Sequence, residues 1–180
     1  TTFVDLLAND GYKTAAIGKS HLQPFTNLRP MAQNLGTSTT TIEAWQKEQP
    51  TNYQEAPENY LDAESFKIKT PYYGYEHVDM VTSHGDRCGG HYQQWFRKIA
   101  PDWQALHDPI NELSHNYSCP QAYRTPIPEE LYPTAYVRDR TIDYIRSQED
   151  EDAPFFAFVS FPDPHHPFNP PGKYWDMYSP

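Results

Sequence analysis

The strongest structural signal in the chain is the stretch Gly11-Tyr12-Lys13-Thr14-Ala15-Ala16-Ile17-Gly18-Lys19-Ser20-His21. Its apolar centre is followed by a glycine and then by a cation and an imidazole, Lys19 and His21. An apolar run of this length is typical of a strand buried in a parallel sheet. In open α/β sheets, ligands bind just beyond the carboxyl ends of the strands. We therefore predict that Lys19 and His21 stand where an anionic substrate would bind.

A short helix is expected directly before this strand. Phe3, Leu6 and Leu7 are apolar and have the spacing of one helical face, and Thr1 or Thr2 can cap the first turn. Helix followed by strand is half of an α/β repeat unit.

The same order recurs near the other end of the chain. A helix is expected from Thr134, as its cap, to about Ser147, and residues 155–161 form an apolar run of strand length. Helix and then strand fit a right-handed crossover between parallel strands. The predicted fold class is therefore α/β, with a largely parallel sheet flanked by helices.

The middle of the chain is polar and rich in loops. A half-buried strand is expected over residues 74–81, and a helix through Trp95 that Pro101 ends. A short helix is also possible over residues 41–48, and residues 101–128 are expected to form a loop punctuated by prolines.

Composition limits the classes of partner. The formal net charge of −10 argues against nucleic acid or an anionic membrane surface as a partner. A chain of 180 residues is about one domain, and its 18 prolines favour long ordered loops. Cys88 and Cys119 form either one bridge or two free thiols, and both readings stay open, as does the cellular compartment.

Two segments resemble signatures of the sulfatase family. Residues 11–21 match the pattern G-Y-x-T-A-x-x-G-K-x-H in full, and residues 154–168 are similar to another sulfatase segment. The chain is therefore identified as an arylsulfatase-like member of the alkaline phosphatase superfamily. The resemblance implies an alkaline-phosphatase-like (sulfatase) fold, incomplete in this chain, and hydrolysis of a small-molecule or carbohydrate sulfate ester.

The resemblance also implies a division of the chain, which would be part of one catalytic domain. Residues 1–22 would be a helix and strand carrying the Lys-Ser-His motif. Residues 23–128 would be a loop-rich insertion that includes the substrate pocket, and residues 129–180 a helix and strand with the Pro-His-His-Pro-Phe loop.

Three catalytic residues follow from the resemblance. Lys19 would bind the sulfate and the aldehyde-hydrate nucleophile, and His21 would hold that hydrate and help the sulfated hemiacetal to collapse. His165 matches the family's leaving-group histidine and would act as a general acid, a role suited to an imidazole near pH 7. His166 is assigned a place in a substrate subsite.

The segment from residue 83 to 92 concentrates polar side chains around three glycines. His84, Asp86, Arg87 and His91 are candidates for substrate binding, since such density in a loop after a strand is typical of binding sites. An equally weighted alternative is that Asp86 and Arg87 simply pair while the glycines turn the chain. A zinc site here would lack a recognised ligand spacing, so no metal ligand is assigned.

Two parts of a sulfatase active centre are absent from the sequence. The nucleophile is a formylglycine made from Cys or Ser in a C/S-x-P-x-R motif, and the nearest match, residues 118–122, has Ala122 in place of arginine. The acidic ligands for the family's Ca²⁺ also have no match. The chain alone is therefore expected to be inactive, as a piece of a longer enzyme. The alternatives are a phosphonate monoester or phosphodiester hydrolase of the same superfamily and a non-catalytic binding fragment.

Overall fold

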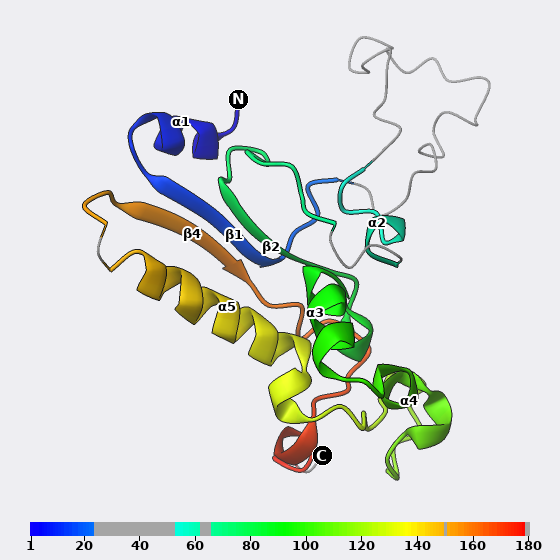
Figure 1. Ribbon diagram of the computed structural model, residues 1–180. Coiled ribbons are helices and arrows are strands. Elements are labelled where there is room, and N and C mark those ends of the chain that lie inside the picture. The colour runs from blue at the N-terminus through cyan, green and yellow to red at the C-terminus, as the bar shows by residue number, and fades with distance from the viewer. Residues whose placement is uncertain (24–52, 62–65, 150, 179–180) are drawn as a thin grey trace, which may run out of the picture.

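The computed structural model describes residues 1–23, 53–61, 66–149 and 151–178, and Figure 1 shows their arrangement. The helix considered for residues 41–48 lies outside the described residues. Among the described residues, no helix has the length and the apolar character that crossing a bilayer requires.

A four-stranded sheet forms the centre of the fold, in the order β3-β2-β1-β4. The strands are β1 (Lys13–Lys19), β2 (His77–Thr82), β3 (Gly89–Gly90) and β4 (Phe155–Ser160). β1 pairs in parallel with both β2 and β4, whereas the short β3 is antiparallel to β2. The predicted α/β class with a largely parallel sheet is therefore confirmed.

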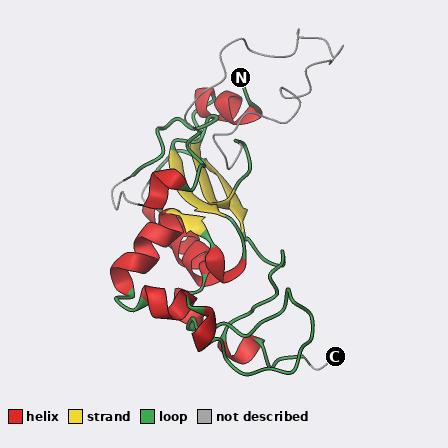
Figure 2. Ribbon diagram, turned by 90° about the vertical axis from the view of Figure 1, so that its right-hand side faces the viewer, coloured by secondary structure: helices red, strands yellow, loops and turns green. Residues whose placement is uncertain are grey.

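Helices cover both faces of this sheet. They are α1 (Phe3–Asn9), α2 (Glu58–Leu61), α3 (His91–Ile99), α4 (Trp103–His107) and α5 (Pro133–Ser147). Short 3₁₀ turns lie at Gly85–Arg87, Pro109–Asn111, Glu129–Leu131 and Gly172–Tyr174. Figure 2 shows the sheet against the helices, with long loops gathered beyond one end of it.

β1 is buried on both faces, and this explains its continuous apolar sequence. Ala15 and Ile17 face the main core, which α3 and α5 complete with Phe96 and Val137 among others. Ala16, one residue out of step, faces the opposite side and packs near α1. Alternate strand residues point to opposite faces, so a strand covered on both faces needs apolar side chains at successive positions.

Gly18, the residue directly before the Lys-Ser-His motif, is required by the close pairing of β1 and β4. Gly18 has a φ of 103°, and a Cβ atom at this position would collide with the backbone oxygen of Ser160. Only glycine combines this backbone conformation with such an approach. Gly18 thus allows β4 to remain paired with β1 up to the residue before Lys19, which ends the strand.

The face that α1 presents to the sheet differs from the prediction. The helix begins as expected, with Thr2 as its N-cap, but Phe3 and Leu6 are 62% and 61% exposed. Val4 is buried instead and packs with Ala16 and Tyr75. Contacts with the sheet orient this short helix: the Phe3 ring still packs edge-on against Phe156 of β4, but Val4, which lies outside the predicted set, takes the buried position.

Thr134 is not the cap of α5, which is a second correction. Tyr132 stands at the N-cap and Pro133 is the first helical residue, a position for which the fixed φ of proline is suited. The Thr134 hydroxyl is therefore free for another use, which is described below. Of the alternatives for the cysteines, the structure shows two free thiols, Cys88 buried and Cys119 exposed.

Candidate active site

Three loops converge at one edge of the sheet. Because β1, β2 and β4 are parallel, their carboxyl ends lie at the same edge. Lys19 ends β1, His84 follows β2 by two residues, and His165 lies in the loop that follows β4. The topology thus brings together side chains that are far apart in the sequence.

Three imidazole rings pack together at this edge, and those of His84 and His165 are stacked. The ring centroids of His84 and His165 are 3.6 Å apart with an interplanar angle of 21°, and those of His165 and His166 are 4.2 Å apart. Burial, together with repulsion from Lys19 and from the rings of His165, His166 and His21, lowers the pKa of His84 to about 4. These groups lie close enough to interact, and we call them the basic cluster: Lys19, His21, His84, His165 and His166.

Lys19 is half-buried at the base of this cluster. Burial lowers the pKa of its amine, and the nearby buried thiol of Cys88 acts in the opposite direction. Lys19 forms no ion pair with any residue in the part of the chain that the structure describes. A cation held without a carboxylate partner is suited to bind an anion from solution.

A glycine brings the loop after β2 against the loop after β4. Gly85 has a φ of 53°, and a Cβ atom there would lie 2.7 Å from Asn169 Oδ1 and 2.8 Å from Pro167 Cγ. Ser83, two residues earlier, also has a positive φ of 64°. This backbone route turns the chain sharply and sets His84 against His165.

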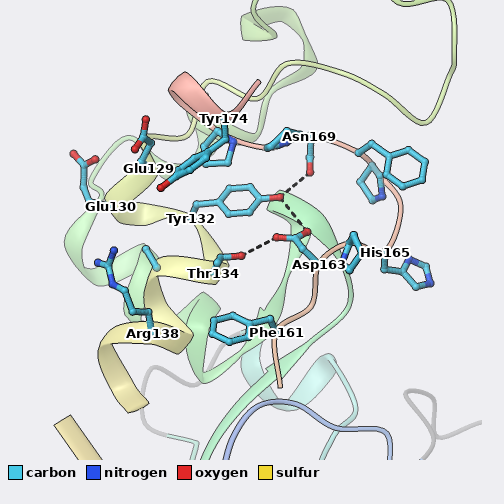
Figure 3. Close-up of a pocket in the computed structure, with 16 residues that line it drawn as sticks. Glu129, Glu130, Tyr132, Thr134, Arg138, Phe161, Asp163, His165, Asn169 and Tyr174 are labelled. Atoms are coloured by element: carbon cyan, nitrogen blue, oxygen red, sulfur yellow. Dashed lines mark hydrogen bonds between the residues drawn. The ribbon is translucent and has the colours of Figure 1, made fainter. Parts of the chain in front are cut away.

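The loop that carries His165 is fixed by hydrogen bonds to α5 and its N-cap. The hydroxyl of Thr134 donates to Asp163 Oδ2 at 2.8 Å, and the hydroxyl of Tyr132 donates to Asn169 Oδ1 at 2.9 Å (Figure 3). Burial raises the pKa of Asp163, although the hydrogen bonds that it accepts from Thr134 and, at 3.5 Å, from the hydroxyl of Tyr132 act against that rise. The Thr134 hydroxyl therefore anchors the histidine loop instead of capping the helix.

A pocket of about 840 Å³ opens beside His165. Figure 3 shows it between the start of α5 and the loop after β4. Phe161, Phe168 and Tyr174 supply aromatic walls, several prolines add apolar surface, and Arg138 lies at its margin. A pocket that is mostly apolar with a few polar groups is typical of a site for an organic ligand.

Three of the predicted binding residues lie outside the basic cluster. Asp86 is 1% exposed and accepts hydrogen bonds from the hydroxyls of Tyr123 and Thr125. Arg87 reaches out beside it, with its Nε 3.6 Å from Asp86 Oδ1. The ring of His91 is built into the contact between α3 and β2, where its Nδ1 accepts from the backbone N–H of Met80 at 3.1 Å.

Sequence reasoning missed Glu55, which lies behind the Lys-Ser-His motif. It is fully buried and accepts a hydrogen bond from the hydroxyl of Ser20 at 2.7 Å. No local pattern marks it, because it approaches the motif from a distant part of the chain. A buried acidic residue in an otherwise polar segment can be recognised only from the fold.

Comparison with known proteins places this geometry in a family. The family model described as Sulfatase matches residues 1–179. The chain belongs to the sulfatase family. This sulfatase chain is also similar to an arylsulfatase of Clostridium perfringens (strain 13 / Type A), with 37% identity over 87 residues. The match covers 48% of this chain but only 17% of that arylsulfatase, so the chain spans a minor part of its relative's length.

The described residues of this sulfatase chain do not fit the metal and the modified residue of the family. Among them, no three His, Cys, Asp or Glu side chains gather in a way that could hold a metal ion. The exposed Cys119 stands in a sequence that has Ala122 where the formylglycine motif needs arginine. Neither Ca²⁺ nor formylglycine is therefore assigned to these residues.

Proposed function

We propose that this chain is part of a sulfuric ester hydrolase and that the basic cluster binds the sulfate group of the substrate. The observation that carries the proposal is the meeting of Lys19, His21, His84 and His165 at the carboxyl edge of the sheet. A sulfate ester has one negative charge and several oxygen acceptors. A half-buried ammonium and neighbouring imidazoles supply the donors that such a group needs.

Each residue of the motif has a separate task in this proposal. Lys19 is a compact cation with three donors, which suits it to hold two oxygens of the sulfate. His21 follows Lys19 by two residues and holds the group that attacks the sulfur. His165 donates a proton to the oxygen of the leaving alcohol, so that the alcohol departs neutral.

The organic part of the ester is assigned to the pocket beside His165. The aromatic walls, among them Phe161 and Tyr174, suit an apolar or ring-shaped group. His165 both lines this pocket and belongs to the basic cluster. The oxygen of the leaving alcohol would therefore lie between the pocket and the basic cluster. His166, which is exposed next to His165, then contacts the substrate without taking part in proton transfer.

The nucleophile and the Ca²⁺ are proposed to come from another part of a longer protein. A proton donor and an anion site cannot replace a covalent nucleophile. The 180-residue chain should therefore show no turnover of an aryl sulfate, even at high protein concentration. Turnover that survives repurification and exceeds that of a heat-killed control would contradict this.

The reaction class is tested with the full-length protein and a panel of esters. An aryl sulfate, an aryl phosphonate monoester and an aryl phosphodiester that share one leaving group are compared by kcat/KM. The sulfate ester should be preferred, and Lys19→Ala should reduce its turnover by a factor on the order of 10² or more, as the loss of one preorganised charge does in other enzymes. A preference for the phosphonate or the diester would instead support the alternative phosphohydrolase function. If none of the three esters is turned over, the result would support the alternative of a non-catalytic binding fragment.

A further inference from the structure

We propose that Glu55 is the positioning residue of the Lys-Ser-His motif: its buried carboxylate holds Ser20 and Leu22, and so fixes His21 between them. This inference rests on the proposed function of the motif and adds a residue to it. It gives residues 53–56, which lie against the end of β1, the role of holding the motif in place.

The contacts converge on a single oxygen atom. Glu55 Oε1 accepts from the hydroxyl of Ser20 at 2.7 Å, from the backbone N–H of Leu22 at 3.1 Å and from the hydroxyl of Tyr72 at 2.6 Å. Glu55 is 0% exposed, and its Oε2 has no hydrogen-bond partner among the described residues. A buried acceptor of this kind holds its donors firmly, because breaking any of these bonds leaves polar atoms without water.

These bonds enclose His21 on both sides in the sequence. In an extended chain, neighbouring side chains point in opposite directions, so Lys19 and His21 share one side while Ser20 points to the other. The burial of the side chains agrees with this alternation: Ser20 is buried, whereas Lys19 is half-buried and His21 is exposed. By holding the Ser20 side chain inward and the Leu22 amide in place, Glu55 directs the His21 side chain toward the anion site.

The segment that carries Glu55 is itself well anchored. The backbone N–H of Gln54 donates to Gln23 Oε1 at 2.7 Å, which adds a second link between the motif loop and this segment. The hydroxyl of Tyr60 donates to the carbonyl of Gln54 at 3.0 Å, and the Tyr60 ring packs edge-on against His91. A carboxylate on such a support can fix a loop, whereas one on a free surface segment could not.

The test compares variants of the full-length sulfatase at Glu55 with variants of its donors. Glu55→Ala removes all three bonds, and Glu55→Gln keeps an oxygen at Oε1 as an acceptor. Ser20→Ala removes only the bond between Glu55 and the Lys-Ser-His motif. Tyr72→Phe removes a bond to the same Glu55 oxygen that does not involve the motif. The matched control is Glu58→Ala, which changes an exposed glutamate three residues away.

We expect Glu55→Ala to reduce kcat for an aryl sulfate by a factor on the order of 10², the cost of a misplacement of about 1 Å in a catalytic group. Glu55→Gln should recover most of that loss. Ser20→Ala should lower kcat more than Tyr72→Phe does, although both remove one bond from the same oxygen. Glu58→Ala should leave kcat unchanged, and melting temperatures identify any variant that fails to fold.

A second readout does not depend on turnover. Hydrogen exchange of the Leu22 amide should become about tenfold faster in Glu55→Ala, while the amides of β1 keep their protection. Unchanged exchange at Leu22, or faster exchange with unchanged kcat, would overturn the role of Glu55 and leave the proposed function intact. A wild-type protein without turnover of any sulfate ester would overturn the proposed function, and the positioning role with it.

Discussion

His165 lies where two features of the site meet, the stacked imidazoles and the apolar pocket. A general acid matters in proportion to the need of the leaving oxygen for a proton. A nitrophenolate leaves readily without one, whereas an alkyl or sugar alkoxide does not. The proposed role of His165 therefore predicts a dependence on the leaving group.

In the full-length enzyme, His165→Ala should cost little with activated aryl sulfates and about 10²–10⁴-fold with alkyl or sugar sulfates. The measurement is kcat/KM over a series of sulfate esters graded by leaving-group pKa. His166→Ala is the matched control and should show no such trend. If His165→Ala lowers kcat/KM equally for every leaving group, His165 binds the sulfate instead. If the losses in His166→Ala depend on the leaving group, His166 is the general acid.

His84 predicts a pH dependence of stability. Its folded-state pKa of about 4 lies below the ordinary value of 6.5, so the unfolded chain takes up the proton more readily. The contribution of His84 to stability is therefore complete above about pH 6.5 and declines as the pH falls toward 4. Urea unfolding should show a smaller decline over this window in His84→Asn than in the wild type. Equal declines would place the pKa of His84 near its ordinary value.

At the scale of elements, the site depends on the contact between the loops after β2 and β4. Gly85→Ala forces a side chain into the positive φ region, at a cost of about 1–2 kcal/mol, and also drives its Cβ against Asn169 and Pro167. Gly11→Ala is the matched control, since Gly11 has a φ of 91° but nothing within 4 Å of the added atom. The free energy of unfolding should fall further in Gly85→Ala than in Gly11→Ala. Equal losses would show that the loops are not held at this contact.

The elements themselves were largely predictable, because their signals are local. A few consecutive residues are enough to predict the apolar strands β1 and β4, and the helix that precedes each of them. The cap of α5 was missed because Thr134 bonds to Asp163, 29 residues away. Glu55 and the stack of His84 on His165 were missed for the same reason: each is a contact between segments that only the folded chain brings together.

Across the whole molecule, the basic cluster places one lysine and four histidines at one edge of the sheet of an acidic chain, and we expect it to bind a tetrahedral anion. The net charge of −10 makes the local excess of positive and neutral donors at Lys19 and the histidines the distinctive feature. Salt screens the long-range repulsion between the acidic side chains of the chain and an approaching anion. The attraction of the anion to the half-buried Lys19 is screened much less.

The most direct measurement is a crystal structure of the full-length sulfatase soaked in sulfate. We expect one sulfate ion with its oxygens about 3 Å from Lys19 Nζ and from a ring nitrogen of His21, on the side of the cluster that faces His165. The same soak of Lys19→Ala should show no ion there. A Lys19 amine turned away from His21 toward a carboxylate, or a sulfate bound only elsewhere, would contradict the claim that these residues form one anion site.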